Sequence, residues 1–266
     1  MTAAMITSTA NAQVKHVAAL AKKARYRRET GLFVAEGPKM VRELPRDRVC
    51  QVYATGRFLQ DSSHACVTEG IENIQAVTEE VLKAMSDTQT PQGILAVARA
   101  YRYSMADLLE GDGPRLLMIL ETIQDPGNLG TILRAGEGAG VTGVIMDQTT
   151  ADIYNPKVIR STMGSVYRVP FLYTENLAET LAGLKSRGVR LYAAHLKGSA
   201  DYDQEDYSGD TGFLIGNEAR GLGEETAAMA DRFIRIPMAG RVESLNAAVA
   251  SSILMFEAAR QRRRGN

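Results

Sequence analysis

Apolar residues recur at two different spacings along the chain, and their alternation predicts an α/β protein. Five consecutive apolar residues at 116–120 have the length and composition of a buried strand, whereas residues 11–28 carry apolar positions at helical spacing with bases between them. In the C-terminal part, strands are predicted at residues 115–120, 143–146, 189–194, 212–215 and 233–236, and helices at 129–138, 156–163, 176–187, 224–229 and 245–262. This alternation predicts a mostly parallel sheet that helices cover on both faces.

The N-terminal part alternates in the same way over shorter segments. Strands are predicted at residues 31–35, 49–53, 73–77 and 92–99, and helices at 11–28, 37–44 and 79–85. Residues 101–114 contain the run Gly-Asp-Gly-Pro and are predicted to form a linker. We therefore predict two domains, a smaller α/β domain at residues 1–104 and a larger one at residues 105–266, each of an ordinary size for a domain.

The composition is that of an ordinary globular protein, with 45% hydrophobic and 23% charged residues. No apolar stretch is long enough to span a membrane, and the N-terminus does not follow the pattern of a secretory signal. The two cysteines, Cys50 and Cys66, do not form a CxxC pair or a disulfide framework. We therefore expect a cytoplasmic protein without a membrane partner.

The formal net charge is zero, so binding to nucleic acid through bulk charge is not expected. The bases are nevertheless clustered, and six of them precede the first acidic residue: Lys15, Lys22, Lys23, Arg25, Arg27 and Arg28. Such a cluster can form a local phosphate-binding surface, although a solvated helix face would look the same in sequence. The arginines between residues 260 and 264 fit either phosphate binding or the dipole at a helix C-terminus.

Common catalytic motifs do not occur. Gly136, Gly138 and Gly140 form GxGxG after a predicted helix, so the dinucleotide-binding pattern fails in both spacing and context. The chain has no GxxxxGK[ST] phosphate loop, no HExxH and no GxSxG, and its three histidines are too scattered in sequence to indicate a metal site. A nucleotide-dependent enzyme on a Rossmann sheet, a metalloenzyme and a hydrolase with a catalytic triad are therefore disfavoured.

Three predicted strands end in loops of unusual composition. After residues 115–120, Asn128 lies at the predicted helix start, where an Asn fits an N-cap, and Arg134 follows between apolar neighbours. After residues 212–215, Gly216-Asn217-Glu218 allows a close backbone approach and supplies a carboxylate. Because open α/β sheets bind ligands at the carboxyl ends of their strands, these loops predict a binding site.

The third loop follows residues 233–236 and leads to Ser244-Leu245-Asn246. Ser244 is predicted to be the N-cap of the last helix. The apolar positions Leu245, Val249, Ile253 and Phe256 predict the buried stripe of that helix. Each of the three loops taken alone would also fit an ordinary turn.

Taken together, the three loops resemble the signature motifs of the SpoU (TrmH) family of RNA ribose 2′-O-methyltransferases, which belong to the SPOUT class. They contain Asn128-x-Gly130-x-Ile132-x-Arg134-Ala135, Gly216-Asn217-Glu218-x-x-Gly221-Leu222 and Ile236-Pro237-Met238-x-Gly240-x-x-x-Ser244-Leu245-Asn246. The motifs are complete and stand in the family's order across about residues 115–262. The N-terminal part, with Asn11-x-x-Val14-Lys15 and Phe33-Val34-x-Glu36-Gly37, is similar to the family's L7Ae/L30e-like RNA-binding domain.

The resemblance implies a SPOUT domain whose parallel sheet carries a deep trefoil knot, with S-adenosylmethionine bound in the knot loops and a homodimer completing each site. The cofactor-binding residues it implies are Leu196, Gly216, Asn217, Ile236 and Leu245. The catalytic residues it implies are Asn128, Arg134, Glu218, Ser244 and Asn246. The six bases from Lys15 to Arg28 would bind RNA, and no metal is implied.

The implied reaction methylates a ribose 2′-hydroxyl. Arg134 is the family's presumed catalytic residue, but a guanidinium is always protonated and has no acceptor, so we favour a clamp on a phosphate or on the developing alkoxide. Asn128 would orient Arg134 or the ribose, and the proton would leave to a phosphate, to water or with help from Glu218. Ribosomal RNA is the favoured substrate because of the extra N-terminal domain, with transfer RNA second and no DNA expected. A non-catalytic RNA-binding or assembly factor is the alternative.

Overall fold

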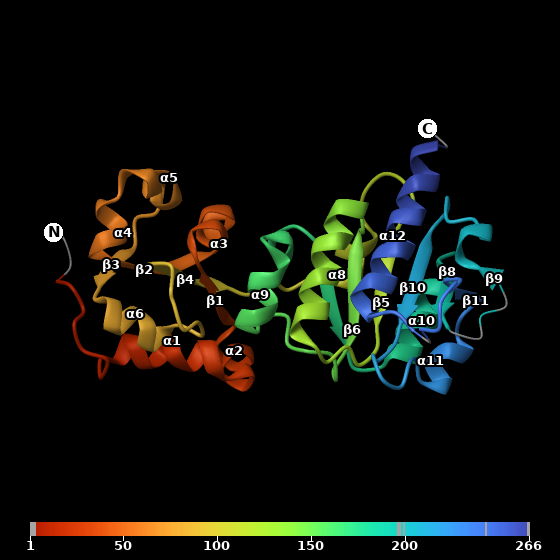
Figure 1. Cartoon of the computed structure of the whole chain (residues 1–266), viewed down its shortest axis with the longest axis horizontal. Helices are drawn as coiled ribbons and strands as arrows, with labels where there is room; N and C mark the ends of the chain where they lie inside the picture. The colour runs from red at the N-terminus through yellow and green to blue at the C-terminus, as the bar shows by residue number, and fades with distance from the viewer. Residues whose placement is uncertain (1–3, 196–197, 199, 243, 265–266) are drawn as a thin grey trace. The chain divides into compact units, whose positions relative to one another are not determined.

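The computed structural model describes residues 4–195, 198, 200–242 and 244–264, which form two compact units. The first unit comprises residues 1–101 and 152–167, and the second comprises residues 102–151 and 168–266. Each unit has a sheet of its own (Figure 1). The sequence placed one boundary after residue 104, whereas the chain passes between the units three times. Local patterns could not assign residues 152–167 to the first unit, because their partners there are distant in sequence.

The first unit is built on a mixed four-stranded sheet in the order β1-β4-β2-β3. Strand β4 pairs antiparallel with β1 and β2, and β2 pairs parallel with β3. The strands are β1 (Leu32–Glu36), β2 (Val49–Thr55), β3 (Ile74–Val77) and β4 (Ile94–Arg99). The helices are α1 (Ala12–Lys22), α2 (Ala24–Thr30), α3 (Pro38–Glu43), α4 (Gly56–Gln60), α5 (Ala65–Thr68), α6 (Glu79–Met85) and α9 (Pro156–Thr162), with 3₁₀ turns η1 (Arg46–Arg48), η2 (Ser62–His64) and η3 (Ser165–Tyr167).

Helices α1 and α6 lie side by side beneath this sheet (Figure 1). Val17 of α1 and Leu82 of α6 are fully buried in one cluster with Leu95 of β4. The sequence predicted a single helix at residues 11–28, which was wrong, because Lys23 has an extended backbone and separates α1 from α2. Four of the predicted strands in this unit are present, whereas the short elements α4, η2 and α5 were not predicted.

The second unit contains a seven-stranded sheet in which every recorded pair is parallel. Its order is β7-β6-β5-β10-β8-β11-β9. The strands are β5 (Leu116–Leu120), β6 (Gly143–Asp147), β7 (Phe171–Thr174), β8 (Arg190–Ala194), β9 (Ala200–Asp201), β10 (Thr211–Ile215) and β11 (Arg232–Arg235). The helices are α7 (Met105–Leu109), α8 (Pro126–Ala139), α10 (Leu177–Ser186), α11 (Glu224–Ala228) and α12 (Ala247–Arg264), with the 3₁₀ turn η4 (Tyr202–Gln204). No helix in the part of the chain that the structure describes is long and apolar enough to cross a bilayer.

The central strand β5 is buried on both faces, as the apolar run predicted. Leu117 and Ile119 pack in a cluster with Leu184 of α10. The alternate residues of the strand point to the opposite face and are equally buried. The five strands predicted for this part of the chain are confirmed, and the prediction of a parallel α/β sheet is confirmed with them. The sequence missed β7 and β9, which are short edge strands, and α7, which lies in the predicted linker.

The order in which the chain adds strands to the sheet reverses at β5. From β5 the chain builds β6 and β7 on one side, and it then crosses to the other side, where β8 and β9 are formed before β10 takes the place between β5 and β8. The carboxyl ends of β5 and β10 therefore lie next to each other at a topological switch point, where open sheets bind ligands. After β11 the chain crosses back to pack α12 against α8 and β10 (Figure 1). The trefoil knot stays a prediction from the resemblance.

Helix α12 does not bury the stripe that the sequence predicted. Val249 and Phe256 are 48% and 46% exposed, while the buried positions include Ala248, Leu254 and Met255. This face packs against α8, where a Cβ added at Gly136 would lie 3.5 Å from the sulfur of Met255. The prediction was wrong because the helix has two apolar faces, and spacing alone does not say which one meets the sheet.

Candidate functional site

Polar side chains from three loops meet at the carboxyl edge of the second sheet. Asn128 donates from Nδ2 to Oε1 of Glu218 at 2.9 Å and accepts at Oδ1 from Nδ2 of Asn246 at 2.8 Å. These pairs join residues that are 90 and 118 positions apart in sequence, in the regions that follow β5, β10 and β11. The structure therefore brings together three of the five residues that the motifs marked as catalytic.

The orientation of each amide in this triad is determined by its neighbours. A carboxylate only accepts hydrogen bonds, so Asn128 presents Nδ2 to Glu218 and keeps Oδ1 for Asn246. Asn246 uses its Oδ1 to accept from the backbone N–H groups of Ala248 and Val249, at 2.9 and 3.3 Å, and therefore turns Nδ2 toward Asn128. The donors and acceptors match in only one arrangement, which makes the triad rigid.

Asn128 is not the N-cap that the sequence predicted. Helix α8 begins at Pro126, and Asp125 caps it by accepting from the backbone N–H of Asn128 at 2.8 Å. Asn128 is thus inside the first turn, and its side chain is released from capping for the contact with Glu218. Pro126 is favourable at the first position of a helix because it has no N–H to satisfy there.

Ser244 is also not a cap, because Asn246 has that role at the start of α12. Both residue types cap helices well, so the sequence could not decide between them. Ser244 is exposed two residues earlier, and its side chain makes no hydrogen bond with the described part of the chain. Asn246 therefore combines two functions, since its oxygen caps the helix while its amide group holds Asn128.

The loop after β10 is ordered by Asn217, which the sequence assigned to cofactor binding. Its Oδ1 accepts from the backbone N–H groups of Ala219 and Arg220, and its Nδ2 donates to the carbonyl of Thr122 at 2.9 Å. Its backbone exchanges hydrogen bonds with Gly221 in both directions. The side chain of Asn217 is thus occupied in positioning the loop that carries Glu218.

Gly216 begins this loop at a very close backbone crossing. A Cβ added there would lie 2.2 Å from the carbonyl carbon of Gly221 and the nitrogen of Leu222, so only glycine fits. At the far end of the loop, the carboxylate of Glu121 accepts from the backbone N–H of Gly223 at 2.7 Å and from the hydroxyl of Thr226. Sequence reasoning missed Glu121, and its position directly after a buried strand is the signal that could have found it.

Arg134 lies exposed on α8 and makes no hydrogen bond or ion pair with any residue that the structure describes. Asn128 does not contact it, because both polar side-chain atoms of Asn128 are bonded to Glu218 and Asn246; the predicted alternative, that Asn128 orients the ribose, stays a prediction. The two residues are six positions apart, which is about 9 Å along a helix axis. The guanidinium of Arg134 is therefore available for an anionic ligand.

The remaining cofactor candidates lie in the loops after β8 and β11. Ile236 and Leu245 are half-buried, and outside the strand ladders and helices the backbone of neither forms a hydrogen bond with the described residues. Half-buried backbone donors and acceptors need partners, and an adenosine moiety can supply them together with an apolar surface. These residues therefore fit a nucleoside ligand. Leu196, the fifth candidate, lies outside the described residues.

Five of the six N-terminal bases are exposed. The exception is Arg27, which is 5% exposed and donates to Oδ2 of Asp152 at 2.9 and 2.6 Å and to the carbonyl of Leu20 at 2.6 Å. The prediction that Arg27 binds RNA is wrong, because its guanidinium is buried and forms an ion pair with Asp152 inside the first unit. Arg25 pairs with Glu29 on the surface. The side chains of Lys15, Lys22, Lys23 and Arg28 make no hydrogen bond or ion pair within the described chain.

The arginines at the end of α12 have structural partners. Arg262 donates to four backbone carbonyls, those of Pro114, Arg115, Tyr207 and Gly209, and so fastens the helix to two loops. Arg260 forms a two-pronged ion pair with Glu257. These contacts are structural, and the two roles left open by the sequence, phosphate binding and the helix dipole, both stay predictions.

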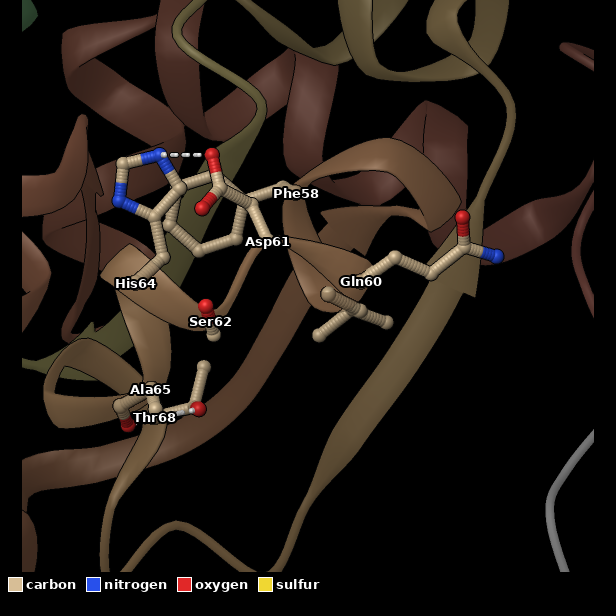
Figure 2. A pocket seen from close by; sticks show the side chains of 8 residues that line it. Phe58, Gln60, Asp61, Ser62, His64, Ala65 and Thr68 are labelled. Carbon is tan, nitrogen blue, oxygen red and sulfur yellow. Dashed lines mark hydrogen bonds and ion pairs between the residues drawn. The ribbon is translucent and has the colours of Figure 1, made fainter.

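Two cavities in the described part of the chain contain no motif residue. One of about 280 Å³ is lined by residues 58–68 of the first unit, where the ring of His64 stacks on Phe58 at 4.2 Å and faces Asp61 (Figure 2). The other, of about 440 Å³, lies between Met105 and residues 174–187. Among the described residues, no group of three His, Cys, Asp or Glu side chains is arranged to hold a metal ion.

Comparison with known proteins agrees with the motifs. Residues 115–256 match the SpoU rRNA Methylase family, and residues 11–96 match the MRM3-like substrate binding domain. The 23S rRNA (guanosine(2553)-2′-O)-methyltransferase RlmP of Bacillus subtilis is 31% identical over 94% of this chain and 97% of its own length. The 23S rRNA (guanosine-2′-O-)-methyltransferase RlmB of Ralstonia nicotianae is 36% identical over 77% of this chain and 84% of its own. The crystal structure of an AdoMet-bound rRNA methyltransferase from Sinorhizobium meliloti superposes with a TM-score of 0.84 at 34% identity, covering 97% of each chain.

Proposed function

This chain belongs to the SpoU rRNA methylase family, and from that premise we propose that it transfers a methyl group from S-adenosylmethionine to a ribose 2′-hydroxyl of ribosomal RNA. The observation that carries the proposal is the triad of Asn128, Glu218 and Asn246, which ties all three family motifs together at the switch point of the sheet. A cytoplasmic location is proposed with it, because the similar rRNA methyltransferases come from bacteria, where ribosomes lie in the cytoplasm.

The cofactor is assigned to the loops after β8, β10 and β11. Gly216, Ile236 and Leu245 would hold it, with the backbone groups of Ile236 and Leu245 as its hydrogen-bond partners and with Asn217 shaping the loop. Leu196, which follows the predicted strand at residues 189–194, is proposed as a weaker further contact. When bound, S-adenosylmethionine supplies a methyl group on a positively charged sulfur, which is already activated toward a nucleophile.

The residues of the chain then have to align the ribose and help to remove its proton. Arg134 is proposed to clamp a phosphate beside the target nucleotide, since its guanidinium has no protein partner in the described chain and offers planar, two-pronged donation. Glu218, which Asn128 holds, is proposed to assist the departure of the 2′-hydroxyl proton to a phosphate or to water. Ser244 and Asn246 would line the substrate edge of the same loop.

RNA binding is proposed for the first unit. The exposed bases Lys15, Lys22, Lys23, Arg25 and Arg28 of α1 and α2 would contact phosphates and so fix the position of a structured RNA. The match of this region to the MRM3-like substrate binding domain supports the assignment. Charge reversal at Lys22, Lys23 and Arg25 should weaken RNA binding and flatten its dependence on salt.

A homodimer is proposed through the exposed face of α12. Val249 and Phe256 are seven residues apart, so they share one face of the helix, and paired exposed apolar side chains mark an interface. The Phe256 ring lies against Gly138 of α8, where an added Cβ would be 3.6 Å away. Arg134 lies one turn before Gly138, so the proposed interface borders the proposed phosphate clamp and the second copy would help to enclose it.

Sedimentation of the Phe256→Glu variant tests the dimer, with Leu59→Glu as the control. Leu59 is similarly exposed, at 41%, but lies on α4 of the first unit. Phe256→Glu should convert the protein to a monomer and lower methyl transfer, whereas Leu59→Glu should do neither. A monomeric wild-type protein with full activity would refute the proposal.

The activity is tested by offering labelled S-adenosylmethionine to the purified protein with unmodified ribosomal RNA or with transfer RNA. Transfer to ribosomal RNA, with one linkage that resists alkaline hydrolysis, is the expected result. Arg134→Ala and Arg134→Lys should both lose most of the activity, since Lys lacks the planar fork, while Arg187→Ala on the exposed end of α10 should keep it. Methyl transfer to transfer RNA alone would refute ribosomal RNA as the substrate. A protein that does not bind the cofactor would be a non-catalytic factor.

A further inference from the structure

Thr122, the second residue after β5, has an unusual backbone conformation. Its φ is +58°, in the left-handed region that non-glycine residues seldom occupy. The conformation is especially unfavourable for a β-branched side chain, so neighbouring groups must hold it in place. The strain occurs within the loop that leads to Asn128.

The residue that holds Thr122 is Asp147, at the end of the adjacent strand β6. One carboxylate oxygen accepts from the backbone N–H of Thr122 at 3.0 Å, and the other accepts from its hydroxyl at 3.1 Å. The same carboxylate is fixed by Thr150, through its N–H at 2.9 Å and its hydroxyl at 2.6 Å, and by the hydroxyl of Thr149. Asp147 thus accepts from both hydrogen-bond donors of Thr122, and the turn that carries Asp147 is itself hydrogen-bonded.

The conformation of Thr122 matters because its carbonyl is a contact of the second motif. That carbonyl accepts from Nδ2 of Asn217 at 2.9 Å, and the Oδ1 of Asn217 orders the loop that follows. Glu218 is the next residue and bonds to Asn128. A continuous series of contacts therefore runs from Asp147 through Thr122 and Asn217 to the triad.

We propose that Asp147 is a positioning residue for the methyltransferase site, which sets the loop of Asn217 and Glu218 by holding Thr122 in its left-handed conformation. It does not contact substrate or cofactor in this role. The inference rests on the proposed function for its effect on activity, but its effect on the loop is independent of that function.

The test compares Asp147→Asn, Thr122→Gly and the double variant in the full-length protein. An amide offers one acceptor where the carboxylate offers two, so Asp147→Asn should release Thr122. Methyl transfer should fall by at least about tenfold, which a misplaced catalytic group readily causes. Amide hydrogen exchange in the peptide spanning residues 216–223 should become faster. Asp206→Asn is the control, since Asp206 also accepts from a neighbouring serine, Ser208, but in a loop apart from the motifs.

Thr122→Gly separates positioning from general stability. Glycine adopts a positive φ without steric cost, so it does not need Asp147. The double variant should therefore regain the slow exchange and most of the activity of Thr122→Gly. If the effects of the two changes simply add, or if Asp147→Asn leaves the exchange of residues 216–223 unchanged, the proposal is wrong.

The exchange measurement keeps the two proposals distinguishable. If the wild-type protein transfers no methyl group, the proposed function fails, while the exchange rates still decide whether Asp147 sets the loop. If Asp147→Asn does not fold, Thr122→Val takes its place, because it keeps the β-branch and the backbone contact and removes only the hydroxyl, which contacts Asp147 and Thr149. Exchange in residues 216–223 should then rise by a smaller factor, and an unchanged rate would refute the role of Asp147.

Discussion

Asn246 combines two roles that can be separated by the choice of substitution. Its Oδ1 caps α12 through Ala248 and Val249, and its Nδ2 donates to Asn128. Asn246→Ala removes both roles. Asn246→Asp keeps an oxygen for the cap and adds a negative charge that favours a helix N-terminus, but it turns an acceptor toward Oδ1 of Asn128. Asn128 cannot adapt by rotating its amide, because its oxygen would then face the carboxylate of Glu218.

The magnitudes follow from these contacts. Loss of an N-cap costs about 1 kcal/mol, and loss of one hydrogen bond costs about 1 kcal/mol more. Asn246→Ala should therefore destabilise the fold by about 2 kcal/mol and lower the melting temperature by roughly 4–8 °C. Asn246→Asp should cost less than about 1 kcal/mol, because the cap is retained. Methyl transfer should fall in both variants, by about tenfold or more, since both disorder Asn128 and Glu218.

Thermal unfolding and single-turnover methyl transfer measured on the same preparations check this pattern. Asn176→Ala is the matched control, because Asn176 caps α10 by accepting from Glu179 at 3.0 Å and has no contact with the triad. The Asn176→Ala variant should lose about 1 kcal/mol of stability, as expected for loss of an N-cap, and should keep its activity. Activity that tracks stability across all three variants, with Asn246→Asp close to wild type, would refute a role for the amide of Asn246.

Three further outcomes are expected. Asp152→Asn should lower the free energy of unfolding in urea by about 3–5 kcal/mol, because it leaves the buried Arg27 without its carboxylate, whereas Arg27→Met with Asp152→Leu should cost less than the single change. Gly216→Ala should abolish cofactor binding in calorimetry, since the new methyl group would overlap the backbone of residues 221 and 222, and Gly183→Ala on α10 should be harmless because nothing lies within 4 Å of its added Cβ. Burial raises the pKa of Asp147, but hydrogen bonds from Thr149, Thr150 and Thr122 outweigh it and hold the pKa below its usual value, so the stability that Asp147 provides is present above about pH 4 and is lost as the pH falls through its folded-state pKa. The difference in unfolding free energy between wild type and Asp147→Asn should accordingly shrink between pH 7 and pH 3, and a constant difference would contradict this reading.

The sequence predicted what depends on local pattern. The run at residues 116–120 had to be a doubly buried strand, and the polar residues after three strands had to gather at one edge of a parallel sheet. The convergence of Asn128, Glu218 and Asn246 agrees with that argument. The trefoil knot could not be predicted from periodicity, and its prediction came only from the resemblance to the family.

Several of the errors at the site arise where sequence cannot rank groups that compete for one role. Asp125 and Asn128 both cap helices well, as do Ser244 and Asn246, and the tertiary contacts of the loops decide between them. Arg27 was assigned to RNA with its basic neighbours because its carboxylate partner lies 125 positions away. The exposed face of α12 was taken for the buried one for a similar reason, since both faces carry apolar residues.

The positions of these errors are themselves informative about the site. Asn128 was mistaken for a cap, and its side chain instead bonds to Glu218 and Asn246. Ser244 was also mistaken for a cap, and the residue that caps the helix in its place, Asn246, bonds to Asn128 as well. A helix start that is capped by Asp125 allows Asn128 to link the first motif to the second, and a cap at Asn246 links the third motif to the first. The helix ends are therefore parts of the site, because the same hydrogen bonds that terminate α8 and α12 determine where the carboxylate of Glu218 is held.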